Sequence, residues 1–445
     1  MLRLKPRKTP SEIDAVLRKL VRTCHRDVPL YQRLFAAYDV DPAMIRAMAD
    51  LPHLPFVQKL DFMGTDPSNH LNSRARLGQT RIRVSSGTTG GQLDTHMSLP
   101  ELMFRRHVFL RRIWRVAGRP LTMHVVQAGS WIAPGPGGDV RHAGVGPLRI
   151  THISRRLPVA EQAAAIVGAE PTVIIGCPSA LDVVASATVR SGLPCPAPSV
   201  VVTRGEILRP QTRRILENVY RCSVVDFYSA EEVGLIAWQC PETPEVMHIE
   251  HDACVVEVVN KRGEPVPDGR MGEVAITNLF NRTMPFVRYR IGDRSRIVPQ
   301  ELVRCSCKGV RFSMSAPAGR PDDFIVLPDR QRVSPRVIDD IVYLACICVG
   351  HDSLFYSSVR DYQIVQETMT RIRIDLLTDL EIPSAVHAAL AHQVLSVHPR
   401  LAATFRAVSS IELAPSGKRS RVVSLVRPTQ DTEKHAAEGP RPAAA

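Results

Sequence analysis

One short stretch of the chain concentrates hydroxyl residues and glycines: Val84-Ser85-Ser86-Gly87-Thr88-Thr89-Gly90-Gly91. Glycines let a backbone enter positive φ and approach a ligand closely, while hydroxyls and exposed N–H groups donate to anionic oxygen. The stretch is not a Walker loop, because no Gly-Lys-Ser/Thr follows it. It predicts a phosphate-binding turn, although a solvent-exposed turn that binds no ligand would have the same composition.

A second group of residues carries the donors of a metal site. Cys240 is followed at a distance by His248, and Cys305 and Cys307 stand one residue apart further along the chain. Three thiolates and an imidazole from two loops suit a tetrahedral zinc ion. The spacing is looser than that of a zinc finger, so reduced, buried cysteines are the alternative. Four other cysteines are expected in the core or in loops: Cys177, Cys195, Cys346 and Cys348.

Length and composition limit the kinds of protein that could hold these groups. A chain of 445 residues exceeds the usual size of one hydrophobic core and predicts a large and a small domain. The N-terminus lacks the apolar core of a secretory signal and no apolar run could span a bilayer, so we expect a cytoplasmic protein without a membrane partner. Ten cysteines at irregular spacing do not resemble a disulfide framework.

The net charge of +13 favours anionic partners. It comes from dispersed arginines, including Arg105, Arg106, Arg111, Arg112 and Arg115. Nucleotides, coenzyme A and nucleic acid would all be compatible with this charge, but the chain shows no nucleic-acid recognition motif. We therefore expect small anionic ligands.

The elements that must position these groups are visible in the sequence. Thr9, Pro10 and Glu12 form a capping box for a first helix. Apolar strands then alternate with helices from about residue 120, which predicts a parallel sheet covered on both faces. The expected elements are strands at 172–175 and 199–202 around a helix capped by Ser179 and closed by Gly192, strands at 254–259 and 273–277, then strands at 362–365, 371–376 and 409–413 with a helix at 384–397.

Six motifs in order identify the chain as similar to a known family: Ser85-Ser86-Gly87-Thr88-Thr89-Gly90, Arg204-Gly205-Glu206, Asp226-Phe227-Tyr228-Ser229-Ala230-Glu231-Glu232, Met284 to Asp293, Gly319-Arg320-Pro321-Asp322-Asp323 and Gly417-Lys418. They resemble the adenylate-forming enzymes, in the branch of phenylacetate–CoA ligases with its capsule-biosynthesis and deazaflavin-adenylating relatives. Some members of this branch also have a Cys…His…Cys-x-Cys arrangement, which supports the zinc interpretation.

The resemblance implies a fold and a set of domains. It is an α/β fold: a large N-terminal adenylate-forming domain with parallel sheets, helices and a β-rich subdomain, followed by a small mobile α+β domain. The expected limits are residues 1–318 for the AMP-binding domain and 319–430 for the small one, with a disordered tail at 431–445. Asp322 falls at the hinge position between the domains, where an ordinary turn is the alternative.

The resemblance also implies roles for individual residues. Lys418 and Glu232 would be catalytic, with Glu232 holding Mg²⁺ and Lys418 stabilising the charge that develops as a carboxylate attacks the α-phosphorus of ATP. The remaining nucleotide-binding positions are Ser85, Ser86, Gly87, Thr88, Thr89, Gly90, Gly205, Glu206, Tyr228, Asp293 and Arg320. Taken singly, each has an ordinary structural alternative, such as a core tyrosine or a surface lysine.

Several positions depart from the pattern of the family. Gly91 and Gln92 stand where many members have a basic residue and a proline, and Ser229 replaces a usual glycine. Glu231 replaces a hydroxyl residue, and this extra carboxylate would either add a ligand or repel phosphate. The loop Leu327-Pro328-Asp329-Arg330 lacks a glycine common after the hinge motif. These departures bear on phosphate handling and on the choice of acceptor.

The expected function is activation of a small, aromatic carboxylic acid by ATP, followed by transfer to coenzyme A. One alternative keeps the adenylation step but sends the acyl or adenylyl group to an amine, a hydroxyl or a carrier protein. Another is a degenerate member that binds nucleotide without turnover, against which the presence of both Glu232 and Lys418 argues. The resemblance is compatible with a homodimer.

Overall fold

The computed structural model describes residues 9–63, 66–84, 93–130, 138–307, 312–318, 325–329, 332–333, 361–378, 380–411 and 422–426. These residues fall into two compact units. The larger unit ends at Pro317, and the smaller begins at Ala318 and also takes in 292–294. Within the described residues, no helix is both long and apolar enough to cross a membrane.

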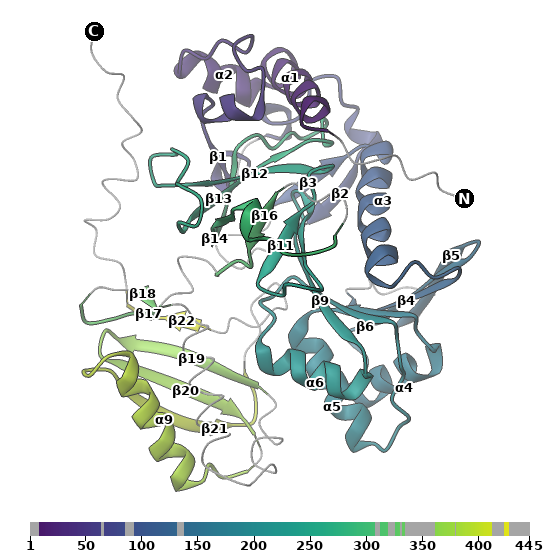
Figure 1. Ribbon diagram of the computed structural model, residues 1–445, viewed down its shortest axis with the longest axis vertical. Coiled ribbons are helices and arrows are strands. Elements are labelled where there is room, and N and C mark those ends of the chain that lie inside the picture. The colour runs from purple at the N-terminus through teal and green to yellow at the C-terminus, as the bar shows by residue number, and fades with distance from the viewer. Residues whose placement is uncertain are drawn as a thin grey trace. The chain divides into compact units, whose positions relative to one another are not determined.

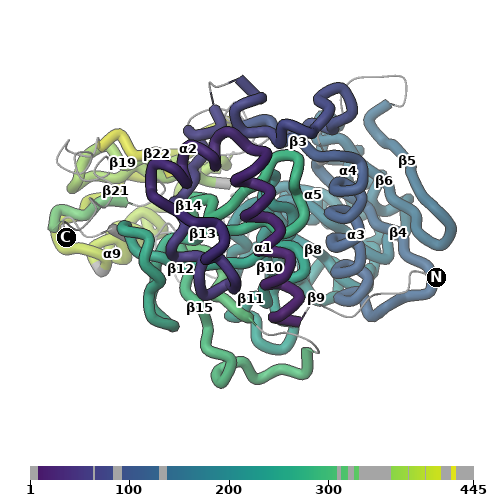
Figure 2. The backbone as a smooth tube through the Cα atoms, turned by 90° about the horizontal axis from the view of Figure 1, so that it is seen from above, coloured from purple at the N-terminus to yellow at the C-terminus, as the bar shows by residue number. Residues whose placement is uncertain are grey.

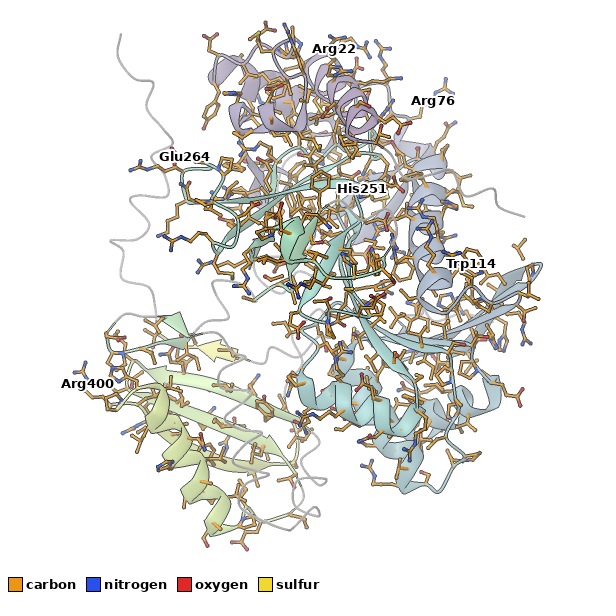
Figure 3. The ribbon with its side chains drawn as sticks, viewed as in Figure 1. Arg22, Arg76, Trp114, His251, Glu264 and Arg400 are labelled. Atoms are coloured by element: carbon orange, nitrogen blue, oxygen red, sulfur yellow. The ribbon has the colours of Figure 1, made fainter. Side chains whose placement is uncertain are left out.

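The chain enters the larger unit through two helices that lie side by side, α1 (Pro10–Asp27) and α2 (Pro29–Ala37) (Figures 1 and 2). The predicted capping box is confirmed, since Thr9 accepts from the Glu12 backbone and the Glu12 carboxylate accepts from the Thr9 N–H at 2.6 Å. Exposed charged side chains such as Arg22, Arg76 and Glu264 point outward, whereas His251 is buried (Figure 3).

A ten-stranded sheet forms the centre of the larger unit, with its middle strands parallel as predicted. In spatial order its strands are β15 (Ile297–Val298), β16 (Ser313–Ser315), β11 (Val246–Ile249), β10 (Gly234–Gln239), β9 (Ser223–Ala230), β8 (Val200–Arg204), β7 (Val173–Gly176), β4 (Met123–Ser130), β6 (Leu148–Ser154) and β5 (Val140–Val145). Antiparallel strands extend it at both edges.

Helices cover both faces of the parallel strands, and the side-chain alternation of each strand decides which face a residue meets. Val200 and Val202 pack with α3 (Leu99–Val116). Val201 packs instead with α4 (Val159–Ala169), α5 (Pro178–Arg190) and α6 (Pro210–Tyr220), which lie side by side in Figure 1. The parallel strands therefore lie between α3 on one face and α4, α5 and α6 on the other.

The start of α5 corrects one prediction. The helix begins at Pro178 with Cys177 at the N-cap, two residues before the predicted cap Ser179. Proline is favoured at the first helical position because its φ is already helical, and that signal outweighs the serine. The predicted end is confirmed: Gly192 has φ +63° and donates to the Val189 carbonyl, which closes the helix.

A second sheet joins distant parts of the larger unit. Its order is β1 (Val57–Gln58), β14 (Tyr289–Ser295), β13 (Gly272–Asn278) and β12 (Cys254–Val259), so both strands predicted in the 254–277 region are confirmed. A separate hairpin of β2 (Arg81–Val84) and β3 (Asp94–Met97) flanks the hydroxyl- and glycine-rich stretch. Short 3₁₀ helices occupy Met48–His53, Lys59–Asp61, Pro67–Asn69, Leu77–Gln79 and Gln300–Leu302.

The smaller unit is α+β. Its four-stranded sheet has the order β21 (Ala402–Val408), β20 (Arg371–Leu377), β19 (Asp361–Thr368) and β22 (Val422–Ser424), and α9 (Ser384–Val397) packs against it. A further pair is β17 (Ile325–Val326) with β18 (Arg332–Val333). The helix and the first two strands are confirmed. The strand predicted at 409–413 is not found at its start, because β21 pairs with β20 over Ala402–Val408 and residues 409–411 are outside any strand; residues 412 and 413 lie outside the described residues.

Candidate functional site

The turn between β9 and β10 carries the two adjacent carboxylates, Glu231 and Glu232. Glu232 is buried, and the Tyr289 hydroxyl donates to its Oε1 at 3.3 Å. The Asn278 amide donates to the Glu232 carbonyl at 3.4 Å, which ties the turn to β13. The second carboxylate oxygen has no hydrogen bond among the described residues, so this side chain suits a cation that needs a charged oxygen ligand.

Glu231 points to two arginines. Its carboxylate accepts from Arg105 Nη2 at 2.8 Å and from Arg83 Nε at 3.2 Å. Arg105 also bonds the Glu231 carbonyl, and its side chain lies against Gly234, whose φ is +88°. Burial alone would raise the pKa of the Glu231 carboxyl, but Arg105 and Arg83 together hold it below its ordinary value. The extra carboxylate is therefore neutralised by neighbours from α3 and β2.

The candidate base-binding residues lie at the carboxyl ends of parallel strands. Gly205 follows β8 with φ +84°, a conformation that favours glycine. The Glu206 carboxylate accepts from the Ser179 backbone N–H at 3.2 Å, at the start of α5. Tyr228 is half-buried on β9 and packs with the cluster that contains Val233. Ligands of open α/β sheets bind at this edge.

The other predicted site residues are placed less fully. Asp293 is half-buried on β14. The phosphate-binding positions Ser85, Ser86, Gly87, Thr88, Thr89 and Gly90 lie outside the described residues, as do Arg320, Asp322 and Lys418. The described strands β2 and β3 mark where the phosphate stretch leaves and rejoins the fold.

Four cysteine and histidine side chains converge in the larger unit. The ligand atoms of Cys240, His248, Cys305 and Cys307 all lie within 4.8 Å of one another. The Cys240 and Cys307 sulfurs are 3.9 Å apart, and the Cys305 sulfur is 3.6 Å from His248 Nε2. A tetrahedral zinc ion with standard bond lengths separates two sulfurs by about 3.8 Å and a sulfur from a nitrogen by about 3.6 Å. The four groups have the spacing of a closed zinc site.

Comparisons with known proteins agree with the motif order. No family model matches the chain. A phenylacetate–coenzyme A ligase of Thermus thermophilus is 25% identical over 423 residues, covering 91% of this chain and 92% of the relative. One of Aromatoleum evansii is 28% identical over 313 residues, covering 69% of each. These relatives support the predicted resemblance to the adenylate-forming superfamily, in its phenylacetate–CoA ligase-like branch.

Solved structures show the same fold. A 2-hydroxyisobutyryl-CoA ligase in the postadenylation state, in complex with 2-HIB-AMP, has a TM-score of 0.76 at 16% identity, covering 96% of this chain and 92% of that one. A benzoate CoA ligase from Burkholderia xenovorans has a TM-score of 0.53 at 16% identity, covering 79% and 69%. The chain thus has the expected α/β architecture.

Residues that sequence reasoning missed hold the cysteine cluster in place. His248 Nδ1 lies 3.1 Å from the Ser313 hydroxyl, which orients the ring so that Nε2 faces the sulfurs. The Trp238 ring packs on His248 with centroids 4.7 Å apart. Glu242 accepts from the Ser306 backbone N–H at 2.9 Å and so joins the two cysteine loops. The pairing of β11 with β16 brings His248 and Ser313 together, and no sequence pattern near either residue predicts that pairing.

Proposed function

We propose that this protein is an AMP-forming acid–CoA ligase that activates a small aromatic carboxylic acid as an acyl-adenylate and transfers the acyl group to coenzyme A. One observation carries the proposal: the match to a phenylacetate–coenzyme A ligase runs over nine-tenths of both chains, 91% and 92%. The chain is therefore long enough to carry out both half-reactions, the adenylation of the acid and the transfer of the acyl group to coenzyme A. A cytoplasmic location, where ATP and coenzyme A are available, accords with this proposal.

The first half-reaction requires two anions to meet. A carboxylate oxygen attacks the α-phosphorus of ATP, and the bond to the pyrophosphate oxygen breaks. Bound Mg²⁺ would neutralise phosphate charge, and the buried Glu232 carboxylate beside the Tyr289 hydroxyl is the residue we assign to hold it. Tyr228 would lie beside the adenine and Asp293 would bind the ribose hydroxyls. Lys418 would stabilise the charge that develops on the transferring oxygens.

The second half-reaction releases AMP. The coenzyme A thiol attacks the acyl carbon, and the bond from that carbon to the adenylate oxygen breaks. We assign Asp322 to a hinge whose rotation would withdraw Lys418 and admit the thiol. An amine, a hydroxyl or a carrier protein as acceptor is the alternative, because the first half-reaction would be the same.

The test is ATP–pyrophosphate exchange over a panel of carboxylic acids, followed by product analysis with and without coenzyme A. We expect exchange that depends on an acid and on Mg²⁺, and an acyl–CoA product with the best acids. Exchange with no thioester formation across the panel would favour the alternative acceptors. Absence of exchange with every acid would contradict the proposal.

We also assign a structural zinc ion to Cys240, His248, Cys305 and Cys307. The distances support this, because they match a tetrahedral ion bound by three sulfurs and one nitrogen. Burial raises the pKa of the Cys240 and Cys307 thiols above the ordinary value, because a buried thiolate is unfavourable without a positive charge beside it. A bound cation would supply that charge to the closely packed thiolates. Four protein ligands leave no position for substrate, so the ion would join two loops and stay outside the reaction.

Purified protein should contain about one equivalent of zinc when prepared without chelators. Cys305→Ser should lose that zinc and lower the melting temperature, because metal binding contributes directly to folding. The matched control is Cys195→Ser, which changes an exposed free cysteine and should alter neither quantity. Metal analysis that finds no zinc in the parent protein would reduce the four residues to packed thiols and an imidazole.

A further inference from the structure

The carboxyl edge of the parallel sheet presents an arginine on the α3 side. Arg204 ends β8, two residues after Val202, which packs with α3. Side chains two apart on a strand share a face. The Arg204 guanidinium accordingly lies over the Phe109 ring of α3, 5.5 Å from its centroid. Phe109 in turn meets the Phe227 ring edge to face at 5.7 Å. Arg204 thus stands beside aromatic rings at the edge where ligands bind.

Other positive charges lie near this arginine, since the field of Arg204 reaches Arg105 and joins that of Arg106 at His152. The field of Arg204 also reaches Glu231, a carboxylate that is already held by Arg83 and Arg105. Among the residues that the structure describes, no carboxylate forms an ion pair with Arg204. Half-buried His152 adds no charge, because burial and the fields of Arg106 and Arg204 lower its pKa. A half-buried cation in such surroundings favours an anionic ligand group.

The groups assigned to the nucleotide base lie on other surfaces of the fold. Glu206 bonds the first turn of α5, a helix of the opposite layer. Tyr228 packs with the cluster around Val233 and Ile236, whereas Phe227, its neighbour on β9, packs with α3. Arg204 and Phe109 therefore share a side of the sheet with each other and not with the base-binding residues.

We propose that Arg204 is a specificity-determining residue that pairs with a second anionic group on an aromatic acid, whose ring packs beside Phe109. This inference rests on the proposed function and narrows its substrate class to aromatic acids with two acidic groups. One carboxylate would be activated, and the other would bind the planar guanidinium fork. Arginine suits this pairing better than lysine, because it can bond both carboxylate oxygens while it stays over the ring.

The test compares matched acids in ATP–pyrophosphate exchange: benzoate against isophthalate and terephthalate, and phenylacetate against its carboxymethyl-substituted diacids. For the parent protein, we expect kcat/KM for the best diacid to exceed that of its monoacid by about tenfold or more. Arg204→Met should lower kcat/KM for the diacid by about 10- to 100-fold and leave that for the monoacid within about twofold. Arg204→Lys should retain an intermediate preference, because it keeps the charge and loses the fork.

The control variant is Arg190→Gln, which removes one exposed positive charge at the end of α5 and should leave both rates unchanged. Equal loss of kcat/KM for both acids would assign Arg204 to the fold, and a raised KM for ATP with every acid would assign it to nucleotide binding. Either result would overturn the inference. A parent protein that prefers monoacids would overturn it too, while the proposed function would stand. Absence of exchange with all acids would overturn both.

Discussion

Replacing Lys418 with alanine is expected to slow acid-dependent ATP–pyrophosphate exchange by about a hundredfold or more. The affinity for MgATP, measured by equilibrium binding, should stay nearly unchanged. The reason is that the ammonium group would contact the acyl and phosphate oxygens mainly when charge develops on them, so its removal raises the barrier and spares the ground state. Pre-steady-state exchange and calorimetric ATP binding on the same preparation separate the two effects.

The matched control for this variant is Lys261→Ala, which removes an exposed lysine from the turn after β12. It should leave exchange unchanged and so exclude a general effect of lowering the net charge. An unchanged exchange rate in Lys418→Ala would remove Lys418 from the mechanism. Parallel loss of ATP binding would show that the lysine binds the ground state instead.

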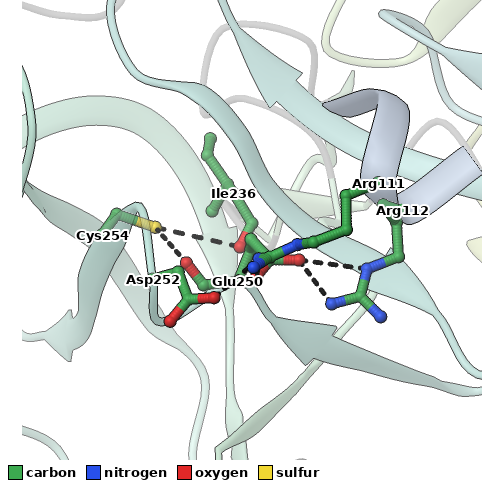
Figure 4. A network of polar contacts seen from close by, with 6 residues as sticks. All are labelled: Arg111, Arg112, Ile236, Glu250, Asp252 and Cys254. Carbon is green, nitrogen blue, oxygen red and sulfur yellow. Dashed lines mark hydrogen bonds and ion pairs between the residues drawn. The ribbon is translucent and has the colours of Figure 1, made fainter. Parts of the chain in front are cut away.

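The largest effect on stability is expected at Glu250, which is fully buried between α3 and the turn before β12 (Figure 4). Its carboxylate accepts from Arg111 Nη2 at 2.8 Å and from Arg112 Nε at 3.0 Å. Asp252 accepts from the same Arg111 at 2.6 Å. In Glu250→Gln, the buried guanidinium groups of Arg111 and Arg112 are left with one carboxylate, that of Asp252. The substitution should therefore lower the free energy of unfolding by about 3–5 kcal/mol.

Urea denaturation measures that change. The control is Glu217→Gln, because Glu217 is 40% exposed and pairs with Arg213 at 3.4 Å on the surface of α6. Its effect should stay below about 0.5 kcal/mol. Equal effects of the two variants would show that the buried cluster contributes no more than a surface ion pair. Arg112 also lies 4.0 Å from the centroid of Trp238, which packs on His248, so loss of Glu250 should also weaken binding of the zinc ion that we propose there.

Local signals in the sequence predicted much of the fold. The cap of α1, the limits of α9 and the glycine that closes α5 are confirmed, because each depends on neighbouring residues alone. The predicted start of α5 was wrong, and β21 precedes the residues predicted for the last strand. In the first, proline at the first helical position decides the start. For the last strand, pairing with β20, about thirty residues earlier, decides which residues form β21, and a local pattern does not give that register.

The candidate site was predicted unevenly for the same reason. Residue type and spacing suggested the cysteine and histidine donors, which the fold then brings together. The partners of Glu231 could not be predicted, since Arg83 lies 148 residues and Arg105 126 residues away in sequence. The alternatives left open for Glu231, a metal ligand or a source of repulsion, gave way to neutralisation by two arginines. Long-range contacts of this kind depend on the packing of α3 and β2 around one turn.

The most direct test of the central claim follows an oxygen atom through the reaction. The best acid from the exchange panel, labelled with ¹⁸O in the carboxylate to be activated, is incubated with the protein, MgATP and coenzyme A. The nucleotide product is then analysed by mass spectrometry. If the acid attacks the α-phosphorus, the product is AMP carrying one ¹⁸O atom, together with pyrophosphate and acyl–CoA. Formation of ADP with the label in inorganic phosphate, or of AMP without label, would contradict the account.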